Sequence, residues 1–129
     1  MSWIENPYFS RSEMSCKCGC GGLPRADFMH RLISIREEAV YEMPISSGFR
    51  CPLYNKKVST SGLNGPHTLG LAADVRVFGY RALRLIELAR KEGMTGFGVS
   101  QKGAFEQRFI HLDCVEASGS FPRPTMWSY

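Results

Sequence analysis

Apolar residues recur early in the chain at the spacing of one helical face. The first set follows Pro24 and consists of Phe28, Leu32, Ile35 and Ala39. Their intervals of four, three and four positions predict a helix with one buried face, beginning near the proline. His30 lies off this face, so we interpret it as a surface residue without a functional role.

A second helix is predicted at about residues 80–92. Its inward-facing side chains are expected to be Leu85, Ile86 and Ala89. The basic dipeptide before Gly93 is typical of a helix end. A brief helix is expected at 52–58, after a short strand within MPISSGFRCP.

Alternation of apolar and polar residues predicts the strands of the sheet. In AADVRV, residues 72–77, Ala73, Val75 and Val77 point one way while Asp74 and Arg76 point the other. TGFGVS and RFIHLDCV are two further predicted strands, and in the second Phe109, His111 and Asp113 share a face.

This mixed order of helices and strands predicts an α+β fold, with a small antiparallel sheet and flanking helices. The stretch before Pro24 is expected to be a loop that is anchored by Trp3, Tyr8 and Phe9.

Composition is ordinary for a globular protein and narrows the function only a little. The 129 residues predict a single domain over 1–129, and no apolar run approaches the ~20 residues that span a bilayer. The N-terminal MSWIENPYFS lacks the features of a signal peptide, so we expect synthesis in the cytoplasm. The net charge of +4 is spread along the chain, so neither nucleic-acid binding nor membrane insertion is expected, and we expect a monomer.

Five cysteines are present, and three of them form Cys16-x-Cys18-x-Cys20. This spacing differs from the C-x2-C arrangement of structural zinc sites. A metal clip is one interpretation, but we favour reduced thiols in a tight glycine-rich loop. Cys51 and Cys114 are interpreted as small hydrophobic residues.

Histidine and aspartate are concentrated in two short segments. The chain has three of each, and two of each lie in GPHTLGLAAD and RFIHLD. Catalytic zinc sites use three protein ligands and a water, and His67, Asp74 and His111 can supply such a set. From spacing alone, the alternative is that these are structural residues held by hydrogen bonds.

Four sequence blocks occur in a specific order between residues 47 and 113. They are Ser47-Gly-Phe-Arg-Cys-Pro52, His67-x-x-Gly-x-Ala-x-Asp74, Gly96-x-Gly98 and Phe109-Ile-His-x-Asp113. Together they resemble the zinc D-alanyl-D-alanine carboxypeptidase family. That family includes phage L-alanyl-D-glutamate endopeptidases and resembles the hedgehog signalling domain in fold. The Cys-Gly-Cys-Gly loop and the C-terminal PRPTMWSY resemble the short, prophage-borne members.

The resemblance implies Zn²⁺ as the cofactor and His67, Asp74 and His111 as its ligands. It also implies that Arg50 faces the carbonyl or carboxylate of the substrate. The alternative for Arg50 is a structural role, such as an ion pair with Asp113.

Two positions depart from the family pattern. Gly65 stands where many members have a serine, which would alter specificity rather than metal binding. Arg108 stands where relatives carry the acidic general base, and it cannot accept a proton. The candidate bases are therefore Asp113, which we favour slightly, and Glu106. For Asp113 the alternative is that it orients a ligand histidine.

The sequence thus predicts a zinc peptidase that cuts stem peptides of bacterial peptidoglycan, as a phage or prophage lysis enzyme acting at the cell wall after release. The alternatives are a non-catalytic, zinc-containing module for cell-wall binding or assembly, and, more weakly, a cysteine hydrolase using Cys51 with His67. Trp127 and Tyr129 either wall the substrate groove or cover the core, so we do not place them in the site.

Overall fold

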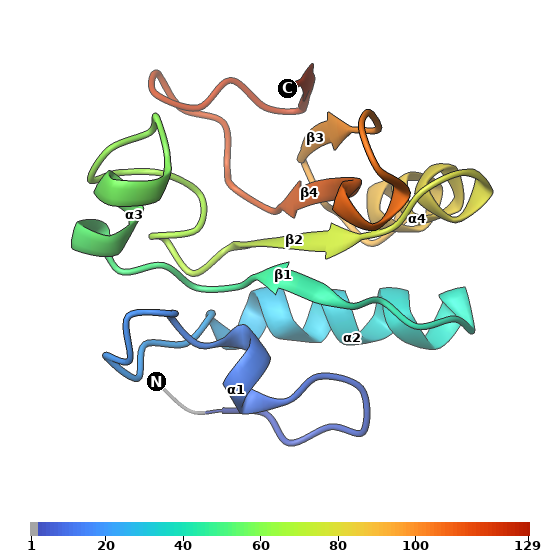
Figure 1. Ribbon diagram of the computed structural model, residues 1–129, viewed down its shortest axis with the longest axis horizontal. Helices are drawn as coiled ribbons and strands as arrows, with labels where there is room; N and C mark the ends of the chain where they lie inside the picture. Colours follow the sequence, from blue (N-terminus) through green and yellow to red (C-terminus); the bar gives the residue numbers. More distant parts are fainter. Residues whose placement is uncertain (1–2) are drawn as a thin grey trace.

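A five-stranded sheet forms the centre of the structure, a computed structural model that describes residues 3–129 (Figure 1). The strands are β1 (Ile45–Ser47), β2 (Ala72–Arg76), β3 (Gly96–Ser100), β4 (Phe109–Asp113) and β5 (Thr125–Ser128). The helices are α1 (Arg11–Met14), α2 (Ala26–Ala39), α3 (Pro52–Val58) and α4 (Tyr80–Lys91), with a 3₁₀ turn at Phe105–Gln107. The predicted α+β class is confirmed.

The strand order is β1-β2-β4-β3-β5, and three of the four pairings are antiparallel as expected. The exception is β5, which pairs in parallel with β3 and makes the sheet mixed. β3 and β4 run in opposite directions. After β4 the chain reverses and crosses to the other side of β3, so β5 runs in the same direction as β3.

Side-chain alternation gives the sheet two chemically different faces. Ala73, Val75, Ile110 and Leu112 belong to the hydrophobic core, together with the buried side chains of α2 and α4. Those helical side chains include Phe28, Leu32, Ile35, Leu85 and Ala89. On β2 and β4 the intervening residues Asp74, His111 and Asp113 therefore project from the opposite face.

Several local predictions need correction. The stretch before Pro24 is not entirely a loop, because Ser10 and Glu13 form a capping box that starts α1. In α4, Ile86 is half-buried against the core, and the prediction left out Leu88, which is fully buried. His30 is exposed as predicted.

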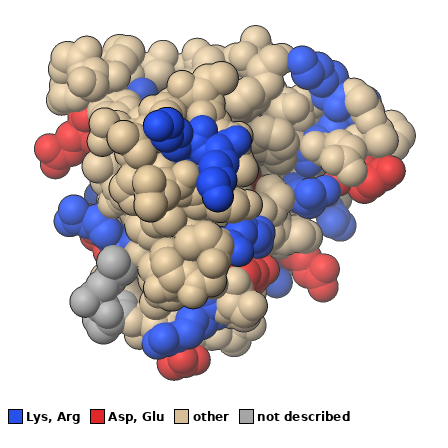
Figure 2. Space-filling model, turned by 60° about the vertical axis from the view of Figure 1, so that its left-hand side comes forward, with Lys and Arg blue, Asp and Glu red and all other residues tan. Residues whose placement is uncertain are grey.

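Neither the charged side chains on the face shown in Figure 2 nor the helices indicate a particular binding partner. Figure 2 shows Lys and Arg in several separate groups on one face, with acidic side chains beside some of them. Among residues 3–129, no helix combines the length and the apolar character needed to cross a membrane.

Two glycines of β3 make room for polar and aromatic side chains. Gly96 pairs with Asp113, and a Cβ at Gly96 would overlap the Asp113 carboxylate. Gly98 pairs with His111, and a Cβ there would come within 2.7 Å of Trp127 Nε1. The Gly96-x-Gly98 block is therefore explained by space on the polar face of the sheet.

The sheet has no room for a side chain at Gly96. Gly96→Ala should lower the free energy of unfolding by about 1–3 kcal/mol, because the Asp113 carboxylate is held by several hydrogen bonds and cannot move aside freely. Gly119→Ala is the matched control, since nothing lies within 4 Å of the position that a Cβ would take there. Urea unfolding of both variants measures the difference, and equal stabilities would contradict this account.

Candidate metal site and adjoining cavity

Two predicted ligands lie opposite each other on neighbouring strands. Asp74 of β2 and His111 of β4 are register partners in the antiparallel ladder. His67 comes from the loop before β2, in a turn where the Thr68 hydroxyl donates to the Gly65 carbonyl at 2.7 Å. Gly70, with φ of 75°, then redirects the chain into β2. The small residues between His67 and Asp74 thus allow a loop and a strand to meet.

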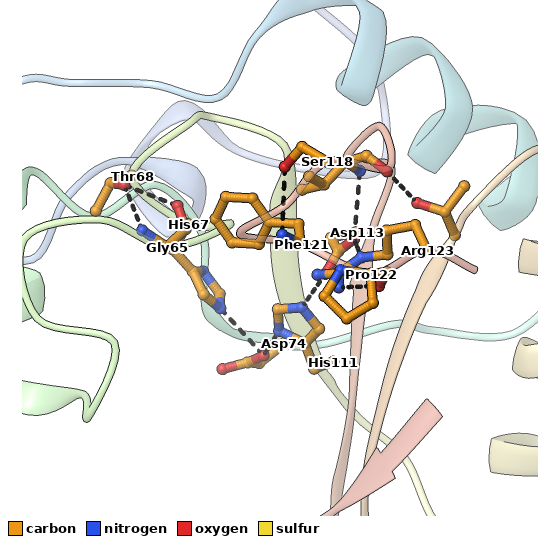
Figure 3. Close-up of polar contacts among 12 residues, drawn as sticks. Gly65, His67, Thr68, Asp74, His111, Asp113, Ser118, Phe121, Pro122 and Arg123 are labelled. Carbon is orange, nitrogen blue, oxygen red and sulfur yellow. Dashed lines mark hydrogen bonds and ion pairs between the residues drawn. The ribbon is translucent and has the colours of Figure 1, made fainter. Parts of the chain in front are cut away.

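The three side chains converge on one point (Figure 3). His67 Nε2 lies 3.3 Å from Asp74 Oδ1, and His111 Nδ1 lies 3.1 Å from the same oxygen. One donor atom from each residue lies within 4.8 Å of the other two. Two imidazoles and a carboxylate in this arrangement can hold a metal ion, and nitrogen and oxygen ligands suit zinc.

The remaining nitrogen of each histidine makes a hydrogen bond on the side away from Asp74. His67 Nδ1 lies 2.7 Å from the Gly48 carbonyl oxygen, and His111 Nε2 lies 2.8 Å from Asp113 Oδ2. A carbonyl oxygen and an ionised carboxylate only accept hydrogen bonds. In a neutral imidazole, the nitrogen that faces such an acceptor therefore carries the ring's proton. His67 Nε2 and His111 Nδ1 then offer lone pairs to the shared point. His67 Nε2 is buried and has no hydrogen-bond partner, which fits a metal-binding role.

The two histidines differ in their protonation. Burial lowers the pKa of His67, and the nearby Asp74 carboxylate offsets only part of this effect. Burial also opposes the charged form of His111, but hydrogen bonds to Asp113 and Asp74 outweigh it and raise the pKa of His111. Burial disfavours ionised Asp74 as well, yet its hydrogen bond with His111 and the nearby His67 ring hold the pKa of that carboxyl well below its usual range.

Asp113 is fully buried behind His111 and has several partners besides it. Arg123 Nε donates to Oδ1 at 3.0 Å and Arg123 Nη2 to Oδ2 at 2.9 Å, while the Val115 amide donates to Oδ1 at 3.3 Å. Burial disfavours the ionised form of Asp113, but its hydrogen bonds with His111 and Arg123 lower the pKa of this carboxyl. The predicted alternative for Arg50, an ion pair with Asp113, is wrong because Arg123 is the residue that makes this pair.

A cavity of about 180 Å³ adjoins the histidines. It is lined by Arg50, Ser59, Thr60, Ser61, Pro66, His67, His111, Trp127 and Tyr129. Arg50 Nε is buried without a hydrogen-bond partner, so the guanidinium has an unused donor at this cavity. A buried, unpaired donor favours a bound anion or carbonyl oxygen.

Neither candidate base lines this cavity. Asp113 contacts the opposite nitrogen of His111, and its oxygens are taken by other donors. Glu106 is exposed in the 3₁₀ turn, where its backbone carbonyl accepts from Arg76. Arg108 closes the same turn by donating from Nε and Nη2 to the Gly103 carbonyl at 3.1 and 3.0 Å. In its observed position, Asp113 does not fit a base acting at the metal.

Sequence reasoning left out three residues that contribute to the site. Arg123 pairs with Asp113, the Trp127 ring lies 5.1 Å from the His111 ring, and Tyr129 lines the cavity. The signal that could have found two of them was the alternation in TMWSY, which predicts that Trp127 and Tyr129 project from the same side of a strand.

A family described as Peptidase M15 matches residues 7–113, which include all three predicted ligands and Asp113. Arg123, Trp127 and Tyr129 lie beyond the matched segment. No curated protein matches the chain.

The role of Asp113 can be tested through metal affinity. Asp113→Ala should weaken zinc binding about 10–100-fold, because His111 loses the partner that orients its ring and selects its tautomer. Competition with a chromogenic chelator measures the affinity. Glu106→Ala is the control and should bind zinc like the wild type. An Asp113→Ala variant with unchanged zinc affinity would rule out the orienting role.

Zinc affinity should also depend on pH in a defined direction. As pH rises, the metal-free site loses the proton of His67 first and that of His111 last, because their pKa values are lowered and raised respectively. Protonated His111 cannot bind zinc, so affinity should increase with pH through the raised pKa of His111 and then level off. Asp113→Ala should move this rise to lower pH. The chelator assay from about pH 5 to about pH 9 measures both curves, and a flat wild-type curve would contradict the assignment.

Proposed function

Because the chain belongs to the peptidase M15 family, we propose that it is a zinc peptidase that hydrolyses peptide bonds in the stem peptides of bacterial peptidoglycan. The observation that carries this proposal is the convergence of His67, Asp74 and His111 beside a cavity with an unpaired arginine donor. Family membership alone would not show whether this chain has kept the residues that such a site needs.

The proposed metal ligands are His67 through Nε2, Asp74 through its carboxylate and His111 through Nδ1. Bound zinc supplies a Lewis acid that polarises the scissile carbonyl and lowers the pKa of a bound water to about 7. The chain itself turns both imidazoles and sets which ring nitrogen carries the proton, through the Gly48 carbonyl and the Asp113 carboxylate. Asp113 is thus proposed as a positioning residue.

Arg50 and Tyr129 are the proposed substrate-binding groups. The Arg50 guanidinium would donate to the substrate carboxylate or to the oxygen that becomes negative during hydrolysis. Partial burial raises the pKa of Tyr129, so its hydroxyl stays protonated at neutral pH and serves as a donor rather than a base. The Trp127 ring, next to His111, would form an apolar wall for the substrate.

Ser61 is placed where it can replace a missing family feature. Gly65 stands at the position where many members have a serine, and the Ser61 hydroxyl occupies the space that a side chain at Gly65 would enter. Ser61 also lines the cavity. We therefore propose that the Ser61 hydroxyl contacts the substrate in place of the serine that many members have at the position of Gly65.

One observation favours a second candidate function. Among residues 3–129, those that line the cavity include no carboxylate, and Arg108 occupies the position of the usual acidic base. A protein that binds zinc and peptidoglycan without cutting it, a wall-binding or assembly module, would have this arrangement. The cysteine hydrolase alternative has less support, because the Cys51 sulfur lies 3.6 Å from the Cys18 sulfur in a separate thiol cluster.

The biological setting that we propose is cell-wall lysis by a phage or prophage, with the enzyme made in the cytoplasm and acting on the wall after release. The bonds at which the site would act are D-Ala-D-Ala, as a carboxypeptidase, or L-Ala-D-Glu, as an endopeptidase. Both are amide bonds flanked by a carboxylate, which suits a cavity with a free guanidinium donor.

Incubation of the zinc-loaded protein with purified peptidoglycan tests the proposal. Mass spectrometry should detect free D-Ala or new amino termini, and chelation of the metal or His67→Ala should abolish both. Arg50→Gln should lower kcat about 100–1000-fold through the loss of a donor to the developing charge. Arg84→Gln, an exposed arginine on α4, is the matched control and should keep full activity.

The same assay separates the two candidate functions. A folded, zinc-replete protein that sediments with peptidoglycan but releases no product would reject the peptidase and support the binding module. The identity of the product from an active protein tells which of the two bonds is cut.

A further inference from the structure

Four cysteine thiols meet in a second cluster, whose members are all different from the three residues that converge at His67. Cys16 and Cys18 sulfurs are 3.3 Å apart, and Cys18 and Cys51 sulfurs are 3.6 Å apart. With Cys20 included, all four sulfurs lie within 4.8 Å of one another. The interpretation of Cys51 as a small hydrophobic residue is therefore wrong, whereas Cys114 does pack against the core.

Glycines allow the short C-x-C-x-C segment to turn its sulfurs toward one point. Gly19 and Gly21 have φ of 85° and 82°, in the left-handed region that side chains disfavour. The Cys16 carbonyl accepts from the Gly19 amide at 3.1 Å, and the Cys16 amide donates to the Gly22 carbonyl at 3.1 Å. The loop thus closes on itself, and Cys51 at the start of α3 completes the cluster.

The arrangement of the sulfurs is that of a tetrahedral metal site. A metal–sulfur distance of about 2.3 Å places the sulfurs of a tetrahedron about 3.8 Å apart, close to the observed separations. Disulfides would join the sulfurs in pairs, whereas all four cysteines here are free. Hydrophobic packing does not explain the cluster either, because Cys18 and Cys20 are exposed. The Cys51 amide also donates to the Cys16 sulfur at 3.3 Å, which joins the loop at Cys16 to the start of α3.

We propose that this cluster binds a structural Zn²⁺, distinct from the metal at the histidines, through the thiolates of Cys16, Cys18, Cys20 and Cys51. Four sulfur ligands in a closed tetrahedron leave no open position for a substrate, so the ion has a structural role. Each thiol gives up its proton to solvent when it binds, and no oxidant or reductant is required. The proposal does not depend on peptidase activity.

The bound ion would fix the loop that organises the neighbouring site. Cys51 follows Arg50 directly, and the Phe49 amide donates to the Met14 carbonyl at 2.9 Å, next to the cysteine loop. Gly48 packs so closely on the Met14 backbone that a Cβ would overlap it. The Gly48 carbonyl in turn holds His67. The cluster therefore cross-links the N-terminal segment to the residues that orient His67 and Arg50.

Metal analysis of the full chain, purified under reducing conditions with zinc, tests the proposal. The wild type should hold about two zinc ions per chain, and the His67→Ala/His111→Ala variant should retain about one. The Cys18→Ser/Cys20→Ser variant should lose the other ion and keep the one at the histidines. Cys114→Ser is the matched control and should hold about two, because its thiol lies outside the cluster.

Cobalt substitution gives a second, spectroscopic readout. The histidine site contains no sulfur, so thiolate-to-cobalt charge-transfer absorption in the wild type can arise only from the cysteine cluster. These bands should be present in the wild type and in Cys114→Ser, and absent in Cys18→Ser/Cys20→Ser.

Three results would overturn the proposal. They are the absence of thiolate bands from the cobalt-loaded wild type, a disulfide within the cluster in protein purified under reducing conditions, and iron in place of zinc in the protein as isolated. Loss of peptidoglycan cleavage with the thiolate bands intact would reject the proposed function but leave the structural zinc in place.

Discussion

The arrangement of the candidate site depends on one constraint, the hydrogen bond that each ligand histidine makes on the side away from the metal. An imidazole binds a metal only through an unprotonated nitrogen, so the proton must be held elsewhere. The Gly48 carbonyl does this for His67 at Nδ1, and the Asp113 carboxylate does it for His111 at Nε2. The nitrogens left facing Asp74 therefore differ, Nε2 in His67 and Nδ1 in His111.

Meeting this constraint with a buried carboxylate imposes further requirements on the fold. An ionised group away from water must be paired, and the Arg123 guanidinium supplies two donors to Asp113. Space for the carboxylate comes from Gly96 on the next strand. The C-terminal segment that carries Arg123 continues into β5, which brings Trp127 over Gly98 and beside His111. The final strand is thus part of the site as well as the edge of the sheet.

The sequence was most informative where the determinants are local. Helical spacing predicted α2 and α4, and alternation predicted that Asp74 points away from the apolar side chains of its strand and that His111 and Asp113 share a face of theirs. It failed for partners that are distant along the chain. Nothing in the pattern near Cys51 indicates the loop at Cys16, which only the folded chain brings to it. The role of Asp113 was also undecided, because its partner Arg123 lies in a segment without a helical or metal-binding motif.

The segment from Gly48 to Cys51 shows why these long-range contacts matter for function. In consecutive residues, the Gly48 carbonyl holds His67, the Phe49 amide binds Met14, Arg50 faces the cavity, and Cys51 joins the thiol cluster. An extended chain directs successive groups to different sides, so one short segment can serve both candidate metal sites. The two sites keep separate ligands, but one stretch of backbone positions residues of both. The rigidity that peptide hydrolysis needs at His67 and Arg50 is therefore supported from outside the cavity, through the sulfurs.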